Sequence, residues 1–168
     1  MCQFVIQYHL IDYLKGVIVM NKKKIILGVL IVAWLCFIWG HSLQPAVVSD
    51  GESGIFLAFF SKLIPALNNA EDGMFIIRKA AHFTEYTVLG ALLTGNAILY
   101  VRGFLNRFFH PAFAGLAVSF IDETIQLFVE GRSGQVSDMW IDFAGVCLGI
   151  LIILAVINNK GRAHGRNY

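Results

Sequence analysis

Residues 139–157 have the sequence MWIDFAGVCLGILIILAVI, which is apolar throughout except for one aspartate. This length matches the roughly 20 residues that an α-helix needs to cross the hydrocarbon core of a bilayer. Three further stretches, residues 25–40, 83–101 and 112–129, are comparably apolar and far longer than a typical β-strand. We therefore predict an all-α integral membrane protein built as a bundle of four transmembrane helices.

The composition agrees with this class, since 57% of the residues are hydrophobic and only 14% are charged. Such a chain is too apolar for an ordinary soluble domain. The net charge of +2 says little about nucleic acid, but no basic, aromatic-interleaved patch appears, so we expect no nucleic-acid partner. Cys2, Cys36 and Cys147 are scattered, so their spacing indicates neither a disulfide framework nor a metal knuckle.

We divide the chain into three parts. Residues 1–19 precede Met20-Asn-Lys-Lys-Lys24, a typical start of a bacterial membrane protein, and are interpreted as a mis-assigned extension. The alternative for this part is a short interfacial amphipathic segment. Residues 20–160 form the predicted transmembrane domain, and residues 161–168 form a basic cytoplasmic tail.

Lysines and arginines predict the orientation, because they favour cytoplasmic loops. Most of them flank the predicted spans on one side, at positions 22–24, 102, 107, 160, 162 and 166. Only Lys62, Arg78, Lys79 and Arg132 lie on the other side. Both termini are therefore expected in the cytoplasm, and the acid-rich loops are expected on the extracytoplasmic side of the cell membrane.

The first outer loop contains an apolar segment, residues 54–67, which is too interrupted for a span and too apolar for solvent. An interfacial or re-entrant helix in the outer leaflet fits this segment best, and a helix that merely caps the bundle is the alternative. Small residues one turn apart, Gly145 with Gly149 and Ala91 with Gly95, predict close helix packing.

Polar and ionisable residues gather at the outer ends of three predicted helices. Charge at this depth costs on the order of 3 kcal/mol per residue, so such residues indicate a functional site. Helical spacing places Arg78, His82 and Glu85 on one face, and it places Asp138 one turn before Asp142. The catalytic candidates are His82, Glu85, Asp122, Glu123 and Asp142, and the ligand-binding candidates are Arg78, Lys79, Tyr86, Gln126, Arg132 and Asp138.

Each of these residues also has a structural interpretation. Asp138 is well placed to cap the last helix, and Gln126 is well placed to bond across helices. The whole set can also form an ion-pair network. Asp122 and Glu123 fit this interpretation least well, because adjacent carboxylates in an apolar helix need cationic partners, a metal ion or protons.

Five motifs occur in order along the chain: Ser42-x-Gln44, Arg78-Lys79-x-x-His82-Phe83-x-Glu85-Tyr86, Asp122-Glu123-x-x-Gln126-x-Phe128, Gly131-Arg132 and Asp138-x-x-x-Asp142-x-x-Gly145. In combination they resemble the VanZ-like family of small bacterial membrane proteins, over residues 25–157. Ile125 stands where such proteins often have histidine, and Glu130 stands where they often have proline. The resemblance implies a role at the surface of Gram-positive cells, in resistance to teicoplanin-type glycopeptide antibiotics.

The first functional hypothesis is binding in the outer leaflet. The ligand would be an amphiphilic membrane component, such as a lipid-linked cell-wall precursor or a lipoglycopeptide. Arg78, Lys79 and Arg132 would contact its phosphate or carboxylate groups, and Glu85, Asp122 and Asp142 its hydroxyls or amines. The Phe-rich residues 56–60 would contact its acyl chain.

The second hypothesis is an intramembrane hydrolase or transferase that acts on such a lipid-linked substrate. His82 and Glu123 would serve as base and acid, while Arg132 and Lys79 would stabilise charge on a phosphoryl oxygen. The cofactor stays open, because the carboxylates and His82 suit Mg²⁺, Mn²⁺ or Zn²⁺ without matching an established motif. A proton-coupled transporter is disfavoured, because four short spans show no inverted repeat.

Overall fold

The computed structural model describes the backbone of residues 2–62, 64 and 70–164, and the side chains of residues 17–62, 64 and 72–159. The described chain forms five helices and no strands: α1 (Cys2–Ser42), α2 (Ala46–Phe60), α3 (Ala70–Ala97), α4 (Phe104–Gln126) and α5 (Val136–His164). The all-α prediction is therefore confirmed. Parts of the predicted outer segment (63 and 65–67) and the last residues of the basic tail (165–168) lie outside the described residues.

Three helices are long and apolar enough to cross a membrane, over Val17–Ser42, Phe104–Gln126 and Val136–Asn159. They correspond to the first, third and fourth predicted spans. The second predicted span, residues 83–101, lies mainly in α3, which has 28 residues but carries charged side chains along its first half. This polar half explains why α3 is not one of the three apolar helices.

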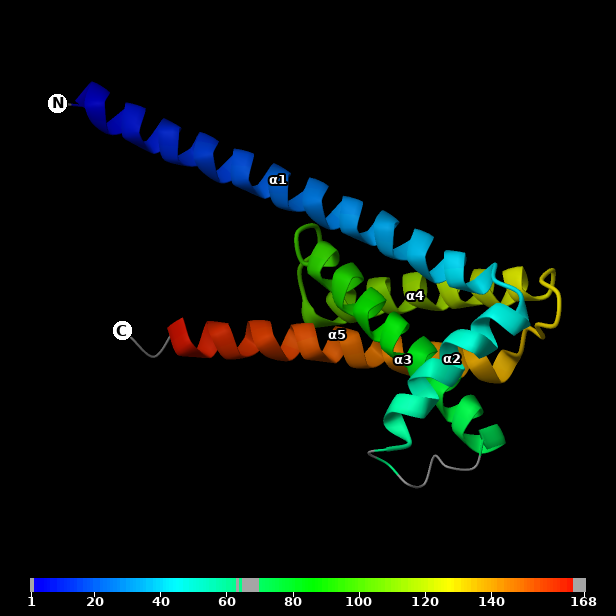
Figure 1. Ribbon diagram of the computed structural model, residues 1–168. Coiled ribbons are helices and arrows are strands. Elements are labelled where there is room, and N and C mark those ends of the chain that lie inside the picture. The colour runs from blue at the N-terminus through cyan, green and yellow to red at the C-terminus, as the bar shows by residue number, and fades with distance from the viewer. Residues whose placement is uncertain (1, 63, 65–69, 165–168) are drawn as a thin grey trace.

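Helix α3 is the centre of the bundle and contacts all four other helices (Figure 1). α4 and α5 lie side by side with it, and α1 packs across α3 and α4. The N-terminal end of α1 and the C-terminal end of α5 lie at one end of the bundle. The α1–α2 corner and the α4–α5 turn lie at the opposite end, which we call the polar end because it carries the buried carboxylates described below.

Glycines allow α3 and α5 to pack backbone against backbone. A Cβ atom added to Gly90, Gly145 or Gly149 would lie less than 3.0 Å from a backbone carbonyl oxygen of the facing helix. This confirms the close approach predicted for Gly145 and Gly149. The predicted Ala91–Gly95 face is looser, because a Cβ atom on Gly95 would meet only a Leu27 methyl carbon at 3.8 Å.

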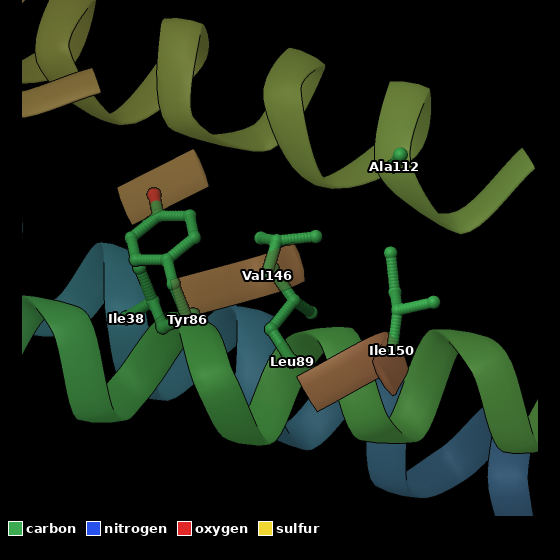
Figure 2. Packing of buried hydrophobic residues seen from close by; sticks show 6 residues of the cluster. All are labelled: Ile38, Tyr86, Leu89, Ala112, Val146 and Ile150. Carbon is green, nitrogen blue, oxygen red and sulfur yellow. The ribbon is translucent and has the colours of Figure 1, made fainter. Parts of the chain in front are cut away.

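A small apolar core lies between these helices. Figure 2 shows the buried side chains of this core. Its members are Ile38, Tyr86, Leu89, Ala112, Val146 and Ile150. Many other large apolar side chains, such as Phe113, Leu127 and Leu151, point outward and are exposed. This distribution suits a lipid environment, in which outward apolar side chains carry no penalty.

The α1–α2 corner and the α4–α5 turn are bonded to each other at the polar end. The Ala46 amide donates to the Glu130 carbonyl, and Gly131 has a φ of 73°, a left-handed conformation that glycine adopts without strain. The helix predicted within residues 54–67 begins earlier than expected, at Ala46 directly after Pro45, and ends at Phe60. Pro45 is the N-cap residue of α2, and its missing N–H costs no helical bond because the first amides of a helix have no intrahelical partner.

Candidate functional site

The polar end of the bundle gathers side chains from four helices. The end of α1 contributes His41 and Ser42, and α3 contributes His82 and Glu85. α4 contributes Asp122, and α5 contributes Asp142. Of the four helices, α1, α4 and α5 hold these residues inside or at the edge of a membrane-length apolar segment.

The centre of this site is a set of three residues, His82, Asp122 and Asp142, which we call the His–Asp–Asp cluster. Each residue offers a nitrogen or oxygen atom, and these atoms all lie within 4.8 Å of one another. Both aspartates have no exposed surface. His82 Nδ1 lies 3.5 Å from Asp142 Oδ1, which is an ion-pair contact and too long for a good hydrogen bond. The sequence predicted all three residues as site candidates, and the structure brings them together.

Hydroxyl groups from neighbouring helices hold both aspartates. Ser42 Oγ donates to Asp122 Oδ1 at 2.5 Å, and Ser119 Oγ donates to Asp142 Oδ2 at 2.8 Å. Gln126 Nε2 completes the set with a longer bond of 3.3 Å to Asp122 Oδ2. Ser119 is a residue that the sequence analysis missed. Its only signal is a small polar residue within an apolar helix, one turn before Asp122.

The wall beside the cluster contains a second pair of titratable groups. His41 Nδ1 and Glu85 Oε1 lie 2.9 Å apart, and the Trp34 indole N–H donates to the Glu85 backbone carbonyl at 2.9 Å. The sequence predicted Glu85 but not His41. The signal for His41 was its position at the C-terminal end of the first apolar stretch, next to Ser42.

Arg132 joins this wall from the α4–α5 turn. Its Nη2 donates to the His41 carbonyl at 3.0 Å, and its Nε donates to the Gln44 carbonyl at 3.3 Å. Burial, together with the charge of Arg78, lowers the pKa of the Arg132 guanidinium from its ordinary value. Arg132 therefore brings positive charge to the site while it holds the α1–α2 corner in place.

A cavity of about 90 Å³ lies between these groups and α2. Four predicted site residues line it: Arg78, His82, Glu85 and Arg132. The other lining residues are His41, Ser42, Ser49, Glu52, Ser53, Phe56, Ile77 and Ala81. The lining thus combines charged and polar side chains with an apolar side formed by Phe56 and Ile77.

Other predicted residues lie near the cluster but do not line this cavity. Lys79 forms an ion pair with Asp138, which lies in the first turn of α5 and so does not precede the helix as a cap. Glu123 accepts a hydrogen bond from the Gln135 amide at 2.8 Å, which ties α4 to the start of α5. Tyr86 is part of the apolar core.

Larger hollows elsewhere are lined by fewer charged and polar residues. One of about 700 Å³ lies between the start of α4 and the end of α5, at the opposite end of the bundle. Its lining is mostly apolar, with Arg107 as its single charged residue. The cluster and the adjacent small cavity are therefore the candidate site.

The arrangement supports acid–base or metal-assisted chemistry on an anionic group. An imidazole and two buried carboxylates can activate a water molecule, and two arginines can bind negatively charged oxygen atoms.

No curated protein and no solved structure shows a significant match to the chain. The family model described as VanZ/LLP1 matches residues 27–158, which include every residue of the site. The chain is thus a membrane protein that belongs to the VanZ/LLP1 family.

Proposed function

We propose that this protein is an intramembrane hydrolase or transferase that acts on the phosphate of a lipid-linked substrate in the outer leaflet. The observation that carries the proposal is the position of the His–Asp–Asp cluster. One of its residues, His82, lines a cavity whose walls include two arginines, Arg78 and Arg132. A buried titratable cluster next to a small polar cavity is typical of a reactive site.

The proposed topology follows from the distribution of basic residues. We take α3 as a fourth span beside the three apolar helices, with α2 as an interfacial helix of the outer leaflet. Lysines and arginines then concentrate on the side of the termini, which favours cytoplasmic termini and an extracytoplasmic site. The exposed phenylalanines of α2, Phe56 and Phe59, would contact acyl chains of the bilayer.

The substrate class follows from the charges and the apolar side of the cavity. Arg132 is half-buried, and Arg78 forms only a long ion pair of 3.4 Å with Asp50, so both keep donors for a phosphate. Guanidinium groups bind phosphate oxygens through two parallel bonds. Because Phe56 and Ile77 form the apolar side, a head group attached to a lipid chain fits this cavity better than a free sugar.

The proposed reaction is the attack of a water oxygen on phosphorus. The new P–O bond forms as the bond to the leaving-group oxygen breaks, and that oxygen takes up a proton. The cluster would bind and deprotonate the attacking water, and the His41–Glu85 pair is within the same cavity to receive or return a proton. Arg78 and Arg132 would stabilise the charge that develops on the phosphoryl oxygens.

A second candidate is binding of a lipid-linked cell-wall component without reaction, which would protect Gram-positive cells against teicoplanin-type glycopeptides. One observation favours it, because two charged groups of the cavity wall, Glu85 and Arg78, already have an ion-pair partner. His41 pairs with Glu85, and Arg78 pairs with Asp50. A site of paired charges suits a ligand that carries both signs, and it needs no nucleophile.

The test uses purified protein in liposomes that contain either a polyprenyl diphosphate or a phosphatidic acid. We expect release of inorganic phosphate by the wild type, and a loss of at least about 100-fold for Asp142→Asn, the usual contribution of a proton-transferring group. Asp138→Asn is the matched control, because this residue lies one turn away on α5 and pairs with Lys79 outside the cavity.

Two outcomes decide between the candidates. If the wild type releases no phosphate from either lipid, the enzymatic proposal is wrong. Susceptibility of a sensitive host to teicoplanin then tests the binding candidate, with membrane levels of wild type and Asp142→Asn matched. If wild type and Asp142→Asn protect the host equally, or if neither protects it, a binding role for the cluster is contradicted.

A further inference from the structure

We infer that the His–Asp–Asp cluster is a binding site for one divalent transition-metal cation, Zn²⁺ or Mn²⁺. Its protein ligands would be His82 on α3, Asp122 on α4 and Asp142 on α5. This inference deepens the proposed function and rests on it only for the catalytic role of the ion. Binding of the ion can be measured separately.

The first argument is the spacing of the ligand atoms. Metal–ligand bonds of Zn²⁺ to nitrogen and oxygen are about 2.0–2.2 Å long, so two neighbouring ligands of one ion lie roughly 3.0–3.5 Å apart. The His82 Nδ1–Asp142 Oδ1 separation is 3.5 Å, and all three ligand atoms lie within 4.8 Å. The three residues therefore need to move by less than a bond length to surround a cation.

The second argument is that buried polar atoms point into the cluster without a hydrogen-bond partner. Asp142 Oδ1 and His82 Nδ1 face each other, and neither makes a hydrogen bond although both atoms are buried. The other oxygen of Asp142 is held by the Ser119 hydroxyl. A carboxylate with one oxygen anchored and the other open is the arrangement that metal-ligating carboxylates show.

Tyr86 supplies an independent observation. Its side chain has no exposed surface, and its hydroxyl oxygen has no hydrogen-bond partner. Figure 2 shows this oxygen pointing toward α4, the helix that carries Asp122. A buried hydroxyl without a partner is rare, and a water molecule bound to the cation would give it one.

The third argument is charge. Two fully buried carboxylates face a single imidazole, so the cluster keeps net negative charge even when His82 is protonated. Among the described residues, no lysine or arginine forms an ion pair with Asp122 or Asp142. A buried carboxylate without a counter-charge is strongly destabilising, and a dication removes this penalty.

The donor set indicates which ions fit. Carboxylate oxygens suit Mg²⁺ and Mn²⁺, whereas imidazole favours Zn²⁺ and related transition metals, so the mixed set points to Zn²⁺ or Mn²⁺. Three protein ligands leave an open position, as in catalytic zinc sites. Because His82 also lines the cavity, that position would be next to the substrate phosphate.

The experiment measures metal binding by the purified full-length protein in detergent. The protein is stripped with EDTA, dialysed, and supplied with Zn²⁺ or Mn²⁺ alone. We expect about one ion per chain by elemental analysis, and a rise in the thermal unfolding midpoint, because a ligand that binds only the folded state stabilises it. Asp122→Asn and Asp142→Asn should each bind the ion at least about tenfold more weakly.

Matched controls separate the cluster from other carboxylates at the polar end. Glu123→Gln and Asp138→Asn change acidic side chains on the same two helices, which make other contacts, and both variants should bind the ion like the wild type. If an aspartate variant does not fold, Ser119→Ala replaces it, because this variant keeps all three ligands. Loss of such a supporting bond typically weakens metal binding about 10–100-fold.

Two results would overturn the inference. One is a stripped wild type that takes up neither ion and shows no change in midpoint. The other is equal uptake by the cluster variants and the controls. Phosphate release in the presence of EDTA separates this inference from the proposed function. Release without bound metal would show that the reaction does not need the ion, whereas stoichiometric metal binding without release would support the metal site and contradict the proposed reaction.

Discussion

The close packing of α3 on α5 makes a quantitative prediction for Gly149. A Cβ atom at this position would lie less than 3.0 Å from the Thr87 carbonyl oxygen and the Ala91 amide nitrogen, whereas ordinary Cβ contacts lie at 3.4–4 Å. Both obstacles are backbone atoms, which cannot rotate away. The Gly149→Ala variant must therefore push the two helices apart by several tenths of an ångström or more.

The loss of folding free energy in Gly149→Ala can be estimated from overpacking in protein cores, which destabilises the folded state by about 1–3 kcal/mol. We expect the upper part of this range, about 2–3 kcal/mol, because no flexible side chain can absorb the shift. For a chain of this size each kcal/mol changes the unfolding midpoint by roughly 2–4 °C. The midpoint of Gly149→Ala should therefore fall by about 4–12 °C.

The assay is thermal unfolding of the purified protein in detergent, followed by intrinsic tryptophan fluorescence. Gly28→Ala is the matched control, because a Cβ atom at Gly28 meets nothing within 4 Å. Both variants make the same Gly-to-Ala change within a helix, which favours the helix by about 1 kcal/mol. Comparing the two removes this contribution and leaves the packing cost.

The contact at Gly149 lies close to the candidate site. Asp142 lies two turns from Gly149 on the same face of α5, and His82 faces it from α3. Equal midpoints for Gly149→Ala and Gly28→Ala would contradict this prediction, because α3 and α5 then do not approach closely enough for a Cβ atom to matter.

Two further predictions concern the supports of the site. Ser42→Ala should lower the free energy of unfolding by about 1.5–3 kcal/mol, because the Asp122 carboxylate loses the short hydrogen bond that the Ser42 hydroxyl donates to it. An unfolding midpoint no lower than that of the exposed control Ser137→Ala would contradict this. Arg132→Lys should loosen the α1–α2 corner, because an ammonium cannot reproduce the two bonds of the guanidinium fork to its carbonyls. We expect amide hydrogen exchange within residues 43–46 to accelerate about fivefold or more, because a loss of roughly 1 kcal/mol in the local opening free energy implies this factor. Exchange at the wild-type rate would show that other contacts hold the corner.

Much of the architecture was predictable because its signals are local. Long apolar stretches correspond to helices α1, α4 and α5, since a membrane-length run of apolar residues has few other stable conformations. Helical spacing also placed the candidate residues correctly on their helices. Helix boundaries were predicted less well. α2 starts at Ala46, earlier than the apolar character of residues 54–67 suggested, and α3 starts at Ala70, well before the predicted span at residues 83–101.

The partners within the polar end were not predictable. The sequence analysis grouped Glu123 with the reactive residues, yet in the structure its carboxylate accepts the Gln135 amide and ties two helices together. Likewise Lys79 meets Asp138, and His41 meets Glu85, although nothing in their local spacing links them. Such pairs depend on how each helix is rotated about its axis, which neighbouring helices decide.

Composition and periodicity act within each segment, so the chain alone was enough to predict a helical, apolar protein with ionisable residues at one end of its predicted spans. The meeting of His82, Asp122 and Asp142 depends instead on how the helices pack, and other acidic residues make different contacts. The physical reason is the packing of α3 against α5 at their glycines, which sets the depth and rotation of the two helices together. These two quantities depend on contacts between residues far apart in the chain, and no single segment contains them.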